Sequence, residues 1–382
     1  MEILAQNHLA QKPGRNGVAV GYSCGARGDP EGHEAVSRTA ISRKLGALRG
    51  CEFHGEYDGS ATYPGPLYFI PDETIAGLDL ARSLGISGEH DLFGGVVPHA
   101  FVATKAISHP LVRPGADAPP GWSAEFGDRV RDAVLSGYTI FSADDARLAC
   151  SRLLEHGPAR LKEVRAKGGH GQSVISTLAE LDAVLDGIEP AELAGHGLVL
   201  EENLTAVTTH SVGQVRVGDL IATYYGTQRL TADNTGKQVY GGTDLVAVPG
   251  GFDRLLTLGL PEAVRTAVIQ ACRYDRAAEA CFPGIILSRR NYDVAQGTGS
   301  DGRRRSGVLE QSWRLGGASG AEVAALEIFR ADPEVKAVRA SCFEAFGTGH
   351  EPHPDATVYF QGHDSKVGPI TKYTVARLDA HT

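Results

Sequence analysis

The chain has 382 residues, of which 42% are hydrophobic and 22% charged, so its composition is that of a folded globular protein rather than a disordered one. Its formal net charge of −9 argues against a nucleic-acid-binding protein, which usually presents a basic face. No apolar run reaches the length that crosses a bilayer, and the first residues lack a signal peptide's apolar stretch. We therefore expect a cytoplasmic protein with no membrane partner.

The first hundred residues alternate between strand and helix patterns. Ile41, Leu45 and Leu48 recur at helical spacing, and short apolar runs before and after them are typical of buried strands. The expected elements are a loose tail at 1–16, strands at 17–22 and 67–70, and helices at 33–48 and 74–84. Strands that alternate with helices predict an open, largely parallel sheet.

The rest of the chain contains clear helix starts and many strand patterns. Residues 108–122 are rich in proline and glycine and are predicted to form a linker or an ordered loop between subdomains. Ser142 is a predicted N-cap, and capping boxes are predicted at Thr177 with Glu180 and at Ser319 with Glu322. A helix is expected at 261–280, and strands at 160–164, 172–175, 198–202, 211–217, 220–228, 285–294, 307–313 and 356–361.

Two glycine patterns are interpreted as turns. Gly218 and Asp219 separate two strand patterns and predict a hairpin. Residues 297–302 match GxGxxG, but a strand follows them where a dinucleotide site would need a helix, so they are predicted to form a hairpin loop.

A glycine-rich segment follows a predicted strand that carries Lys162. In the run Lys167-Gly168-Gly169-His170-Gly171, small residues would let backbone N–H groups approach phosphate oxygens, and an ammonium group nearby would supply positive charge. The same pattern also suits a glycine-rich hairpin with a solvated lysine. The segment alone therefore leaves both interpretations open.

Paired acids end a strongly apolar strand pattern in LVLEENL, residues 198–204. Unpaired carboxylates do not belong beside a core, so Glu201 and Glu202 need a partner or a ligand. Backbone groups at this strand end could bind an adenine edge, and a carboxylate could bind ribose hydroxyls. The alternative is a strand that simply ends at the surface.

The most informative polar pattern lies on two neighbouring strands near the C-terminal third. Glu310, Ser312 and Arg314 alternate along one strand and are predicted to point the same way, because side chains alternate with period two. If the preceding strand pairs as a hairpin, Asp293 joins them. Two carboxylates and a hydroxyl suit magnesium, and the arginine suits a phosphoryl group or an anionic substrate. The alternative is a salt-bridged strand face.

In this order the motifs resemble those of the ATP-grasp superfamily, which includes biotin carboxylase and D-alanine–D-alanine ligase, over roughly residues 100–330. The segments RRNYDVAQG and GVLEQSWRLGGASGAE are similar to a bacterial branch of it without an assigned substrate. The resemblance implies that ATP is bound by Lys105, Lys162, Gly168, Gly169, His170, Gly171, Glu201, Glu202 and Leu204. It implies that magnesium, or manganese in its place, is held by Asp293, Glu310 and Ser312, with Arg314 as the catalytic residue.

One position departs from the superfamily pattern. Ser312 stands where the motif usually has asparagine, and its shorter side chain puts a full two-metal site in doubt. The implied fold is α/β, of the α+β ATP-grasp type. An N-terminal open α/β domain (17–102) precedes a two-lobed module with a small lobe (103–196) and a large lobe with a C-terminal extension (197–382). ATP would lie between two antiparallel sheets.

The resemblance implies an ADP-forming ligase that joins a carboxylate to an amine or thiol through an acyl-phosphate. A small-molecule kinase on the same fold and an inactive nucleotide-binding protein are the alternatives. The expected partner is a small-molecule substrate, and a homodimer is left open. The candidate substrate residues, each with a structural alternative, are Tyr22, Ser23, His33 and Arg290.

Overall fold

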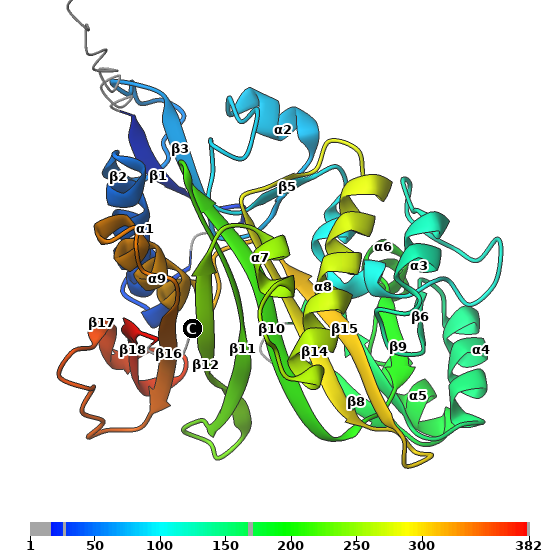
Figure 1. Cartoon of the computed structure of the whole chain (residues 1–382). Coiled ribbons are helices and arrows are strands. Elements are labelled where there is room, and N and C mark those ends of the chain that lie inside the picture. Colours follow the sequence, from blue (N-terminus) through cyan, green and yellow to red (C-terminus); the bar gives the residue numbers. More distant parts are fainter. Residues whose placement is uncertain (1–16, 26–27, 167–170, 380–382) are drawn as a thin grey trace, which may run out of the picture.

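The computed structural model describes residues 17–25, 28–166 and 171–379, so the expected tail lies outside it (Figure 1). Its first elements are β1 (Val18–Tyr22), α1 (His33–Arg49), β2 (Glu52–Glu56) and β3 (Leu67–Pro71). The strands form a parallel sheet in the order β2-β1-β3, and α1 packs on it through Ile41 and Leu45. The predicted parallel sheet, its two predicted strands and the helix are confirmed.

The helix predicted at 74–84 is wrong over its first half. The structure has β4 (Ile75–Ala76), then Gly77 with φ 111°, and only then the short helix α2 (Leu78–Ser83). The short strand pairs with β5 (Gly95–Val97), which in turn pairs with β13 (Ile286–Leu287). Pairing of β4 with β5 therefore outweighs the local helical pattern.

A small four-stranded sheet forms the lobe on the right of Figure 1. Its strands are β6 (Gly137–Ile140), β7 (Ala159–Glu163), β8 (Gln172–Ile175) and β9 (Leu198–Glu202), in the antiparallel order β6-β9-β7-β8. The helices α4 (Ala143–Leu154), α5 (Leu178–Leu185) and α6 (Pro190–His196) accompany it. Ser142 and Thr177 cap α4 and α5 as predicted, because their hydroxyls accept from the N–H groups of Asp145 and Glu180.

The segment between the N-terminal sheet and this lobe is ordered, which agrees with the second of the two predicted alternatives, an ordered loop. It contains two 3₁₀ turns, η1 (Ala100–Ala103) and η2 (Lys105–Ser108), and the helix α3 (Ala124–Val130). Ser108, His109 and Val112 are buried within the stretch that was predicted from its proline and glycine content. The division of the chain at 102 and 196 stays a prediction.

An eight-stranded antiparallel sheet forms the middle of the molecule, in the order β15-β14-β10-β11-β12-β16-β18-β17. Its strands are β10 (Thr205–Val217), β11 (Leu220–Ala232), β12 (Gln238–Pro249), β14 (Arg289–Thr298), β15 (Arg304–Ser312), β16 (Val338–Phe346), β17 (Thr357–Asp364) and β18 (Gly368–Leu378). Val217 pairs with Leu220 across Gly218, which has φ 59°, so the predicted hairpin is confirmed. Residues 299–303 link β14 to β15, which confirms the second predicted hairpin loop.

Helices cover both faces of this sheet (Figure 1). The helices α7 (Phe252–Leu256) and α8 (Glu262–Cys281) lie over one face, and α9 (Ser319–Ala331) lies on the other. Val212 joins the core under α8, whereas Val215 joins the core under α9. The odd spacing of these two residues places their side chains on opposite faces of β10.

Three long strands, β12, β16 and β18, were not predicted. Leu245, Val246, Ala247 and Val248 of β12 are all buried, because both faces of the strand are covered. Such a strand lacks the apolar–polar alternation by which half-buried strands are found. Within the described residues, no helix has the combination of length and apolar character that a membrane span requires.

Candidate active site

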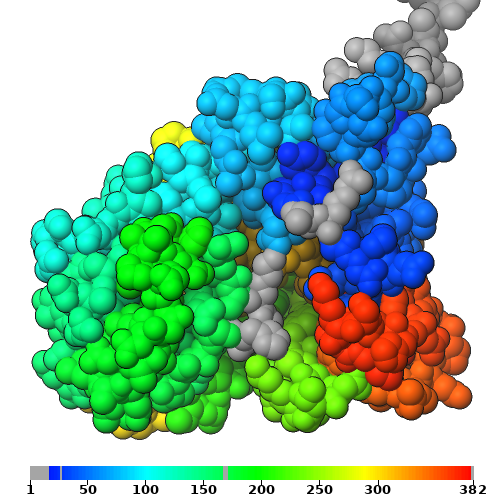
Figure 2. Space-filling view, turned by 180° about the vertical axis from the view of Figure 1, so that it is seen from behind, coloured from blue at the N-terminus to red at the C-terminus, as the bar shows by residue number. Residues whose placement is uncertain are grey.

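The small lobe and the large sheet face each other across an opening. Seen from behind in Figure 2, a hollow lies between the green small lobe, the blue N-terminal region and the red C-terminal strands. Atoms in the orange-brown range of the chain, which includes α9, are visible at its bottom. Most of the polar residues predicted from the sequence come from β7 and β9 on one side and from β14 and β15 on the other, while Lys105 lies in η2 and Arg314 follows β15.

Two carboxylates stand opposite each other on β14 and β15. Asp293 and Glu310 are direct cross-strand partners, so the predicted hairpin pairing is confirmed. The Asp293 Oδ1 atom accepts from the Asn291 amide at 3.0 Å and from the Ser211 hydroxyl at 3.3 Å. Burial and the negative charge of Glu310 raise the pKa of Asp293 to about 6, although these donors oppose the shift. A bound cation would relieve this repulsion.

The expected alignment of residue 314 with residues 310 and 312 on one strand is wrong. The strand β15 ends at Ser312, and Trp313 turns inward, where it is 1% exposed and donates to the Tyr292 hydroxyl. Arg314 follows the turn, donates to the Leu315 carbonyl and pairs with Glu73 of the N-terminal region at 3.2 Å. Burial of the large indole therefore ends the alternation, and the arginine lies at the boundary between the two regions.

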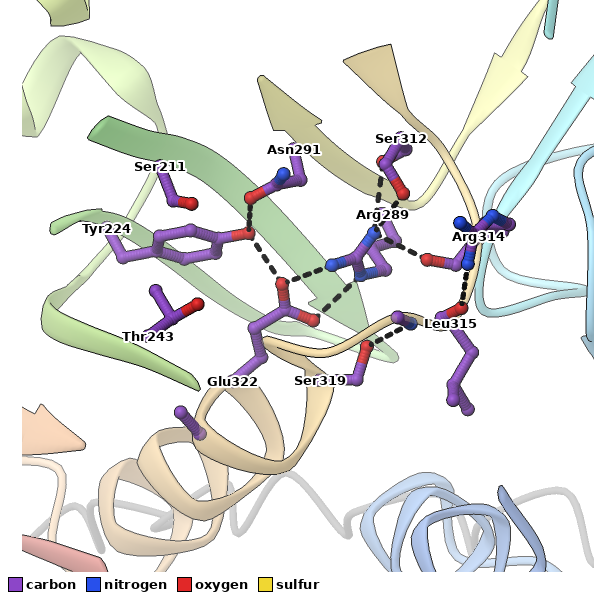
Figure 3. A network of polar contacts seen from close by, with 12 residues as sticks. Ser211, Tyr224, Thr243, Arg289, Asn291, Ser312, Arg314, Leu315, Ser319 and Glu322 are labelled. Carbon is purple, nitrogen blue, oxygen red and sulfur yellow. Dashed lines mark hydrogen bonds and ion pairs between the residues drawn. The ribbon is translucent and has the colours of Figure 1, made fainter. Parts of the chain in front are cut away.

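A buried ion pair supports this turn (Figure 3). The Arg289 guanidinium makes two 2.8 Å contacts with the Glu322 carboxylate, and both side chains are at most 1% exposed. It also donates to the carbonyls of Ser312 and Arg314. The capping box predicted for α9 is wrong, because Glu322 is used in this pair and the Ser319 hydroxyl accepts from the Gly316 N–H. A buried arginine outweighs the local capping rule.

The Ser312 hydroxyl faces this arginine. Its Oγ accepts from the Arg289 guanidinium at 3.3 Å. Across the hairpin, Ser312 is paired with Asn291, whose amide lies between Asp293 and the Tyr224 hydroxyl. Tyr224 has room because residue 213 is glycine, where a Cβ would lie 2.3 Å from the hydroxyl.

Lys105 joins the two lobes. Its ammonium lies 3.0 Å from Glu310 on the large sheet and donates to the Ala166 carbonyl at 2.7 Å beside the small lobe. The side chain of Gln311 donates to the carbonyls of Val102 and Thr104 at 2.8 Å each, which anchors the segment that carries the lysine. Lys105, an ATP-binding residue according to the superfamily pattern, therefore contacts one of the two paired carboxylates.

Lys162 is buried on β7 and pairs with Glu201 on β9. The two side chains are 3% and 2% exposed, with 2.5 Å between Nζ and Oε1, and His109 contacts the other carboxylate oxygen at 3.0 Å. Burial raises the pKa of Glu201, but Lys162 and His109 lower it more, and the resulting pKa is about 2. The Nδ1 atom of His109 has no partner among the described residues, so the ring proton is assigned to Nε2, which donates to Glu201.

Of the remaining predicted ATP residues, the structure describes Gly171, Glu202 and Leu204. Gly171 has φ 61°, and a Cβ there would lie 2.6 Å from the Ala166 side chain, so glycine is required. Gly168, Gly169 and His170 lie outside the described residues. The Glu202 carboxylate accepts from the Ser136 N–H and pairs with Arg305. Leu204 is 6% exposed and packs with Leu135, Ala295 and Leu309.

The candidate substrate residues are dispersed. Ser23 contacts Glu56, and Tyr22 packs in the N-terminal aromatic cluster. The backbone N–H of His33 is capped by Asp364. Arg290 pairs with Asp275 and Glu279 of α8, on the face of β14 opposite to Asn291 and Asp293. The structure therefore does not bring Arg290 to the opening.

The sequence reasoning missed five residues of this site. Arg289 and Asn291 share a strand face with Asp293 at a spacing of two, so strand periodicity could have found them. Glu322 was assigned to a helix cap. Tyr224 and His109 carried no local signal, because their partners lie 67 or more residues away in the chain.

The donor set suits magnesium although it is small. Among the described residues, no group of three or more His, Cys, Asp and Glu side chains is arranged to hold a metal ion. Asp293 and Glu310 nevertheless supply two carboxylates, and magnesium commonly uses only one or two, with water and substrate phosphates completing its shell. The residues present therefore fit a metal that arrives with a nucleotide.

The fold of the chain is similar to that of a solved synthetase, and two further solved structures align with most of the chain at lower TM-scores. An N5-carboxyaminoimidazole synthetase from Staphylococcus aureus, solved with ADP, aligns with 96% of this chain and 95% of its own at a TM-score of 0.54 and 11% identity. A biotin carboxylase from Campylobacter jejuni aligns with 94% and 87% of the two chains (TM-score 0.49, 11% identity). A phosphoribosylamine–glycine ligase from Thermotoga maritima aligns with 94% and 92% (TM-score 0.47, 14% identity).

The chain has the ATP-grasp fold, as its motifs predicted. A family model described as a protein of unknown function, DUF3182, matches residues 22–374, so the chain belongs to this family. No curated protein matches the sequence. At 11% identity the likeness to the synthetase establishes the fold alone.

Proposed function

We propose that this chain binds Mg·ATP between β7–β9 and β14–β15 and uses it as an ADP-forming ligase. The observation that supports this most is the contact of Lys105 with Glu310, 3.0 Å apart, beside the half-buried Asp293. An ammonium and two carboxylates at the meeting point of two lobes suit a polyphosphate with its metal. The ADP bound to the Staphylococcus aureus synthetase of the same fold agrees with this proposal.

The proposed roles follow from the charges of the side chains. Lys105 and Lys162 would hold phosphate oxygens. Lys105 would exchange Glu310 for a phosphate, whereas Lys162 would keep Glu201 and use its remaining N–H donors. Asp293 and Glu310 would hold the magnesium ion, which would offset phosphate charge. Residues 168–171 would supply backbone N–H groups. In this proposal Glu201 and Glu202 orient neighbours rather than bind ribose, because their carboxylates already have partners.

The proposed reaction has two steps. The γ-phosphoryl group moves to a substrate carboxylate oxygen, so its bond to the bridging oxygen of ADP breaks. An amine or thiol then attacks the acyl carbon, loses its proton and displaces inorganic phosphate. The protein mainly positions the groups and offsets charge. Arg314, at the end of β15, would stabilise the anionic acyl-phosphate by exchanging Glu73 for the substrate.

The first test is a melting experiment on wild type and Glu310→Gln, each with and without Mg·ATP. Nucleotide at a hundred times its dissociation constant adds about 2.7 kcal/mol, which corresponds to a rise of about 3 °C for a chain of this length. We expect the rise in wild type and a smaller one in the variant. No rise in wild type would refute the nucleotide site.

The second test identifies the chemistry. Wild-type protein is incubated with Mg·ATP and pools of carboxylates, with and without amines and thiols, and the released nucleotide is measured. ADP that appears only when carboxylate and nucleophile are both present supports the ligase. AMP with pyrophosphate contradicts it, and ADP with a single substrate favours the kinase alternative. Arg314→Gln serves as the matched variant, expected to lower turnover without changing nucleotide affinity.

A further inference from the structure

Ser312 is poorly placed to bind a cation. Its hydroxyl oxygen accepts a hydrogen bond from the Arg289 guanidinium, and Arg289 is only 1% exposed. A metal ion on the same oxygen would compete with this guanidinium, whose charge is already offset by Glu322. If the proposed Mg·ATP site uses a neutral oxygen besides its two carboxylates, another residue should supply it.

Asn291 lies directly across the hairpin from Ser312. The two residues are cross-strand partners, and Asn291 shares a strand face with Asp293, two positions along β14. The asparagine is 6% exposed, and its amide end lies 3.0 Å from Asp293 Oδ1. The chain therefore has an amide beside its carboxylates, but on the opposite strand from the position implied by the superfamily pattern.

The hydrogen bonds around Tyr224 cannot all form at once (Figure 3). Its hydroxyl lies 2.5 Å from the Glu322 Oε1 atom and 2.9 Å from the Asn291 Oδ1 atom, and both are acceptors. A hydroxyl has one proton, and the nearer, charged carboxylate receives it. The contact between Tyr224 and Asn291 then joins two oxygen atoms without a proton between them.

A half-turn of the Asn291 amide removes this conflict. The NH₂ group then donates to the Tyr224 oxygen, and the amide oxygen takes its place about 3.0 Å from Asp293 Oδ1, the distance now measured to the amide nitrogen. Two oxygens that bind one magnesium ion at right angles are separated by about 2.9 Å, because each Mg–O distance is about 2.0–2.1 Å. The turned amide and Asp293 thus have the spacing of adjacent ligands of one cation.

We propose that the Asn291 amide oxygen is the third protein ligand of the metal in the proposed Mg·ATP site, in place of Ser312. The proposal rests on the proposed function. Without metal, the amide donates to Asp293. With metal, it turns and donates to Tyr224, whose proton is held by Glu322. Tyr224 and Glu322 are positioning residues, because they fix the direction of the amide without touching the ion.

The test measures how strongly metal and nucleotide binding reinforce each other. The affinity of the non-hydrolysable analogue AMP-PNP is determined by calorimetry with saturating Mn²⁺ and again with EDTA, and the ratio of the two affinities is the metal dependence. We expect Asn291→Ala to reduce this ratio about tenfold, the usual minimum loss for a perturbed metal site. Ser312→Ala, the matched loss of an oxygen on the facing strand, should leave it within about twofold.

Two further variants separate a ligand from a structural residue. Asn291→Asp keeps an oxygen and should retain the metal dependence, whereas Tyr224→Phe should reduce it by less than Asn291→Ala. Melting temperatures and EDTA affinities without metal show whether each variant is folded, and Asn291→Leu preserves volume if alanine destabilises the sheet.

Each outcome is decisive. A loss confined to Ser312→Ala overturns the proposal in favour of the serine. A wild-type metal dependence that neither substitution changes overturns the assignment of Asn291 but leaves the proposed function standing. If wild type binds AMP-PNP equally with Mn²⁺ and with EDTA, the metal site itself is refuted, and the proposed function fails with it.

Discussion

Two carboxylates on opposite sides of the opening have pKa values that are shifted in opposite directions. Glu201 is almost fully buried, yet contacts with Lys162 and His109 lower its pKa to about 2. Burial raises the pKa of Asp293 to about 6, and the shift persists because Asp293 faces Glu310 and accepts only from neutral groups. Burial alone therefore does not decide the charge state of a buried acid; its partners do.

The difference distinguishes a carboxylate that already contacts a cation from one that, in the proposed function, would bind the metal. Glu201 is already paired with Lys162, and removal of either side chain would leave an uncompensated charge inside the small lobe. Asp293 lacks a cationic contact among the described residues, and the ammonium of Lys105 contacts Glu310 instead. Repulsion between Asp293 and Glu310 is what a bound metal would relieve, so the free energy stored there would contribute to metal affinity.

The largest loss of stability is expected at the ion pair between Lys162 and Glu201, which is closed to solvent. Lys162→Met leaves Glu201 buried without its cation, and the loss of one partner of a buried pair costs about 3–5 kcal/mol of the free energy of unfolding. Chemical denaturation monitored by circular dichroism measures it. The double variant Lys162→Met/Glu201→Gln should recover part of the loss, because both buried charges are then absent.

Lys105→Met is the matched control for this prediction. Its partner Glu310 is 33% exposed and can be hydrated after the substitution, so the expected cost is about 1 kcal/mol. Equal losses for the two lysine variants would contradict the distinction between a closed and an open pair.

The pH dependence of stability tests the opposite directions of the pKa shifts of Asp293 and Glu201. Folded Asp293 holds its proton more tightly than the unfolded chain does, so its contribution to stability falls as pH rises from about 4 to about 6. Glu201 acts oppositely: its contribution is complete above its unfolded pKa of about 4.3 and is lost as pH falls toward about 2.

Asp293→Asn isolates the first of these contributions. The variant should match wild type near pH 3.5, where Asp293 is protonated, and become relatively more stable above pH 6. Melting temperatures of both proteins across this range measure the difference. A constant offset at every pH would show that Asp293 does not titrate near 6.

The smallest change in stability is expected at the ion pair between Arg314 and Glu73, which is more exposed than the two lysine pairs. The Arg314 and Glu73 side chains are 24% and 42% exposed, so Arg314→Gln should change the free energy of unfolding by less than about 1 kcal/mol. Thermal unfolding without ligand measures it. A loss comparable to that of Lys162→Met would indicate that Arg314 supports the turn after β15 rather than serving a substrate.

Several parts of the site were within reach of sequence reasoning. Side-chain alternation and the hairpin pattern placed Asp293 opposite Glu310, because both depend on neighbouring residues. The same rule failed at Arg314, where burial of Trp313 ends the strand. It also ignored a register shift between Asp293 and Val294, which makes Val308, rather than Leu309, the partner of Val294.

The sequence indicated the class of the fold only through the resemblance of its motifs to the ATP-grasp superfamily. By itself it determined the parallel N-terminal sheet, the caps of α4 and α5 and the hairpin at Gly218. These depend on local periodicity, turn residues and spacing along the chain. Tertiary structure alone decided which charges meet. Glu322 was predicted to cap α9 but pairs with Arg289, 33 residues away in the chain. Glu201 contacts His109, which lies 92 residues away in the chain. Buried charges take whichever partner the packed chain brings within reach, and no local pattern records that choice.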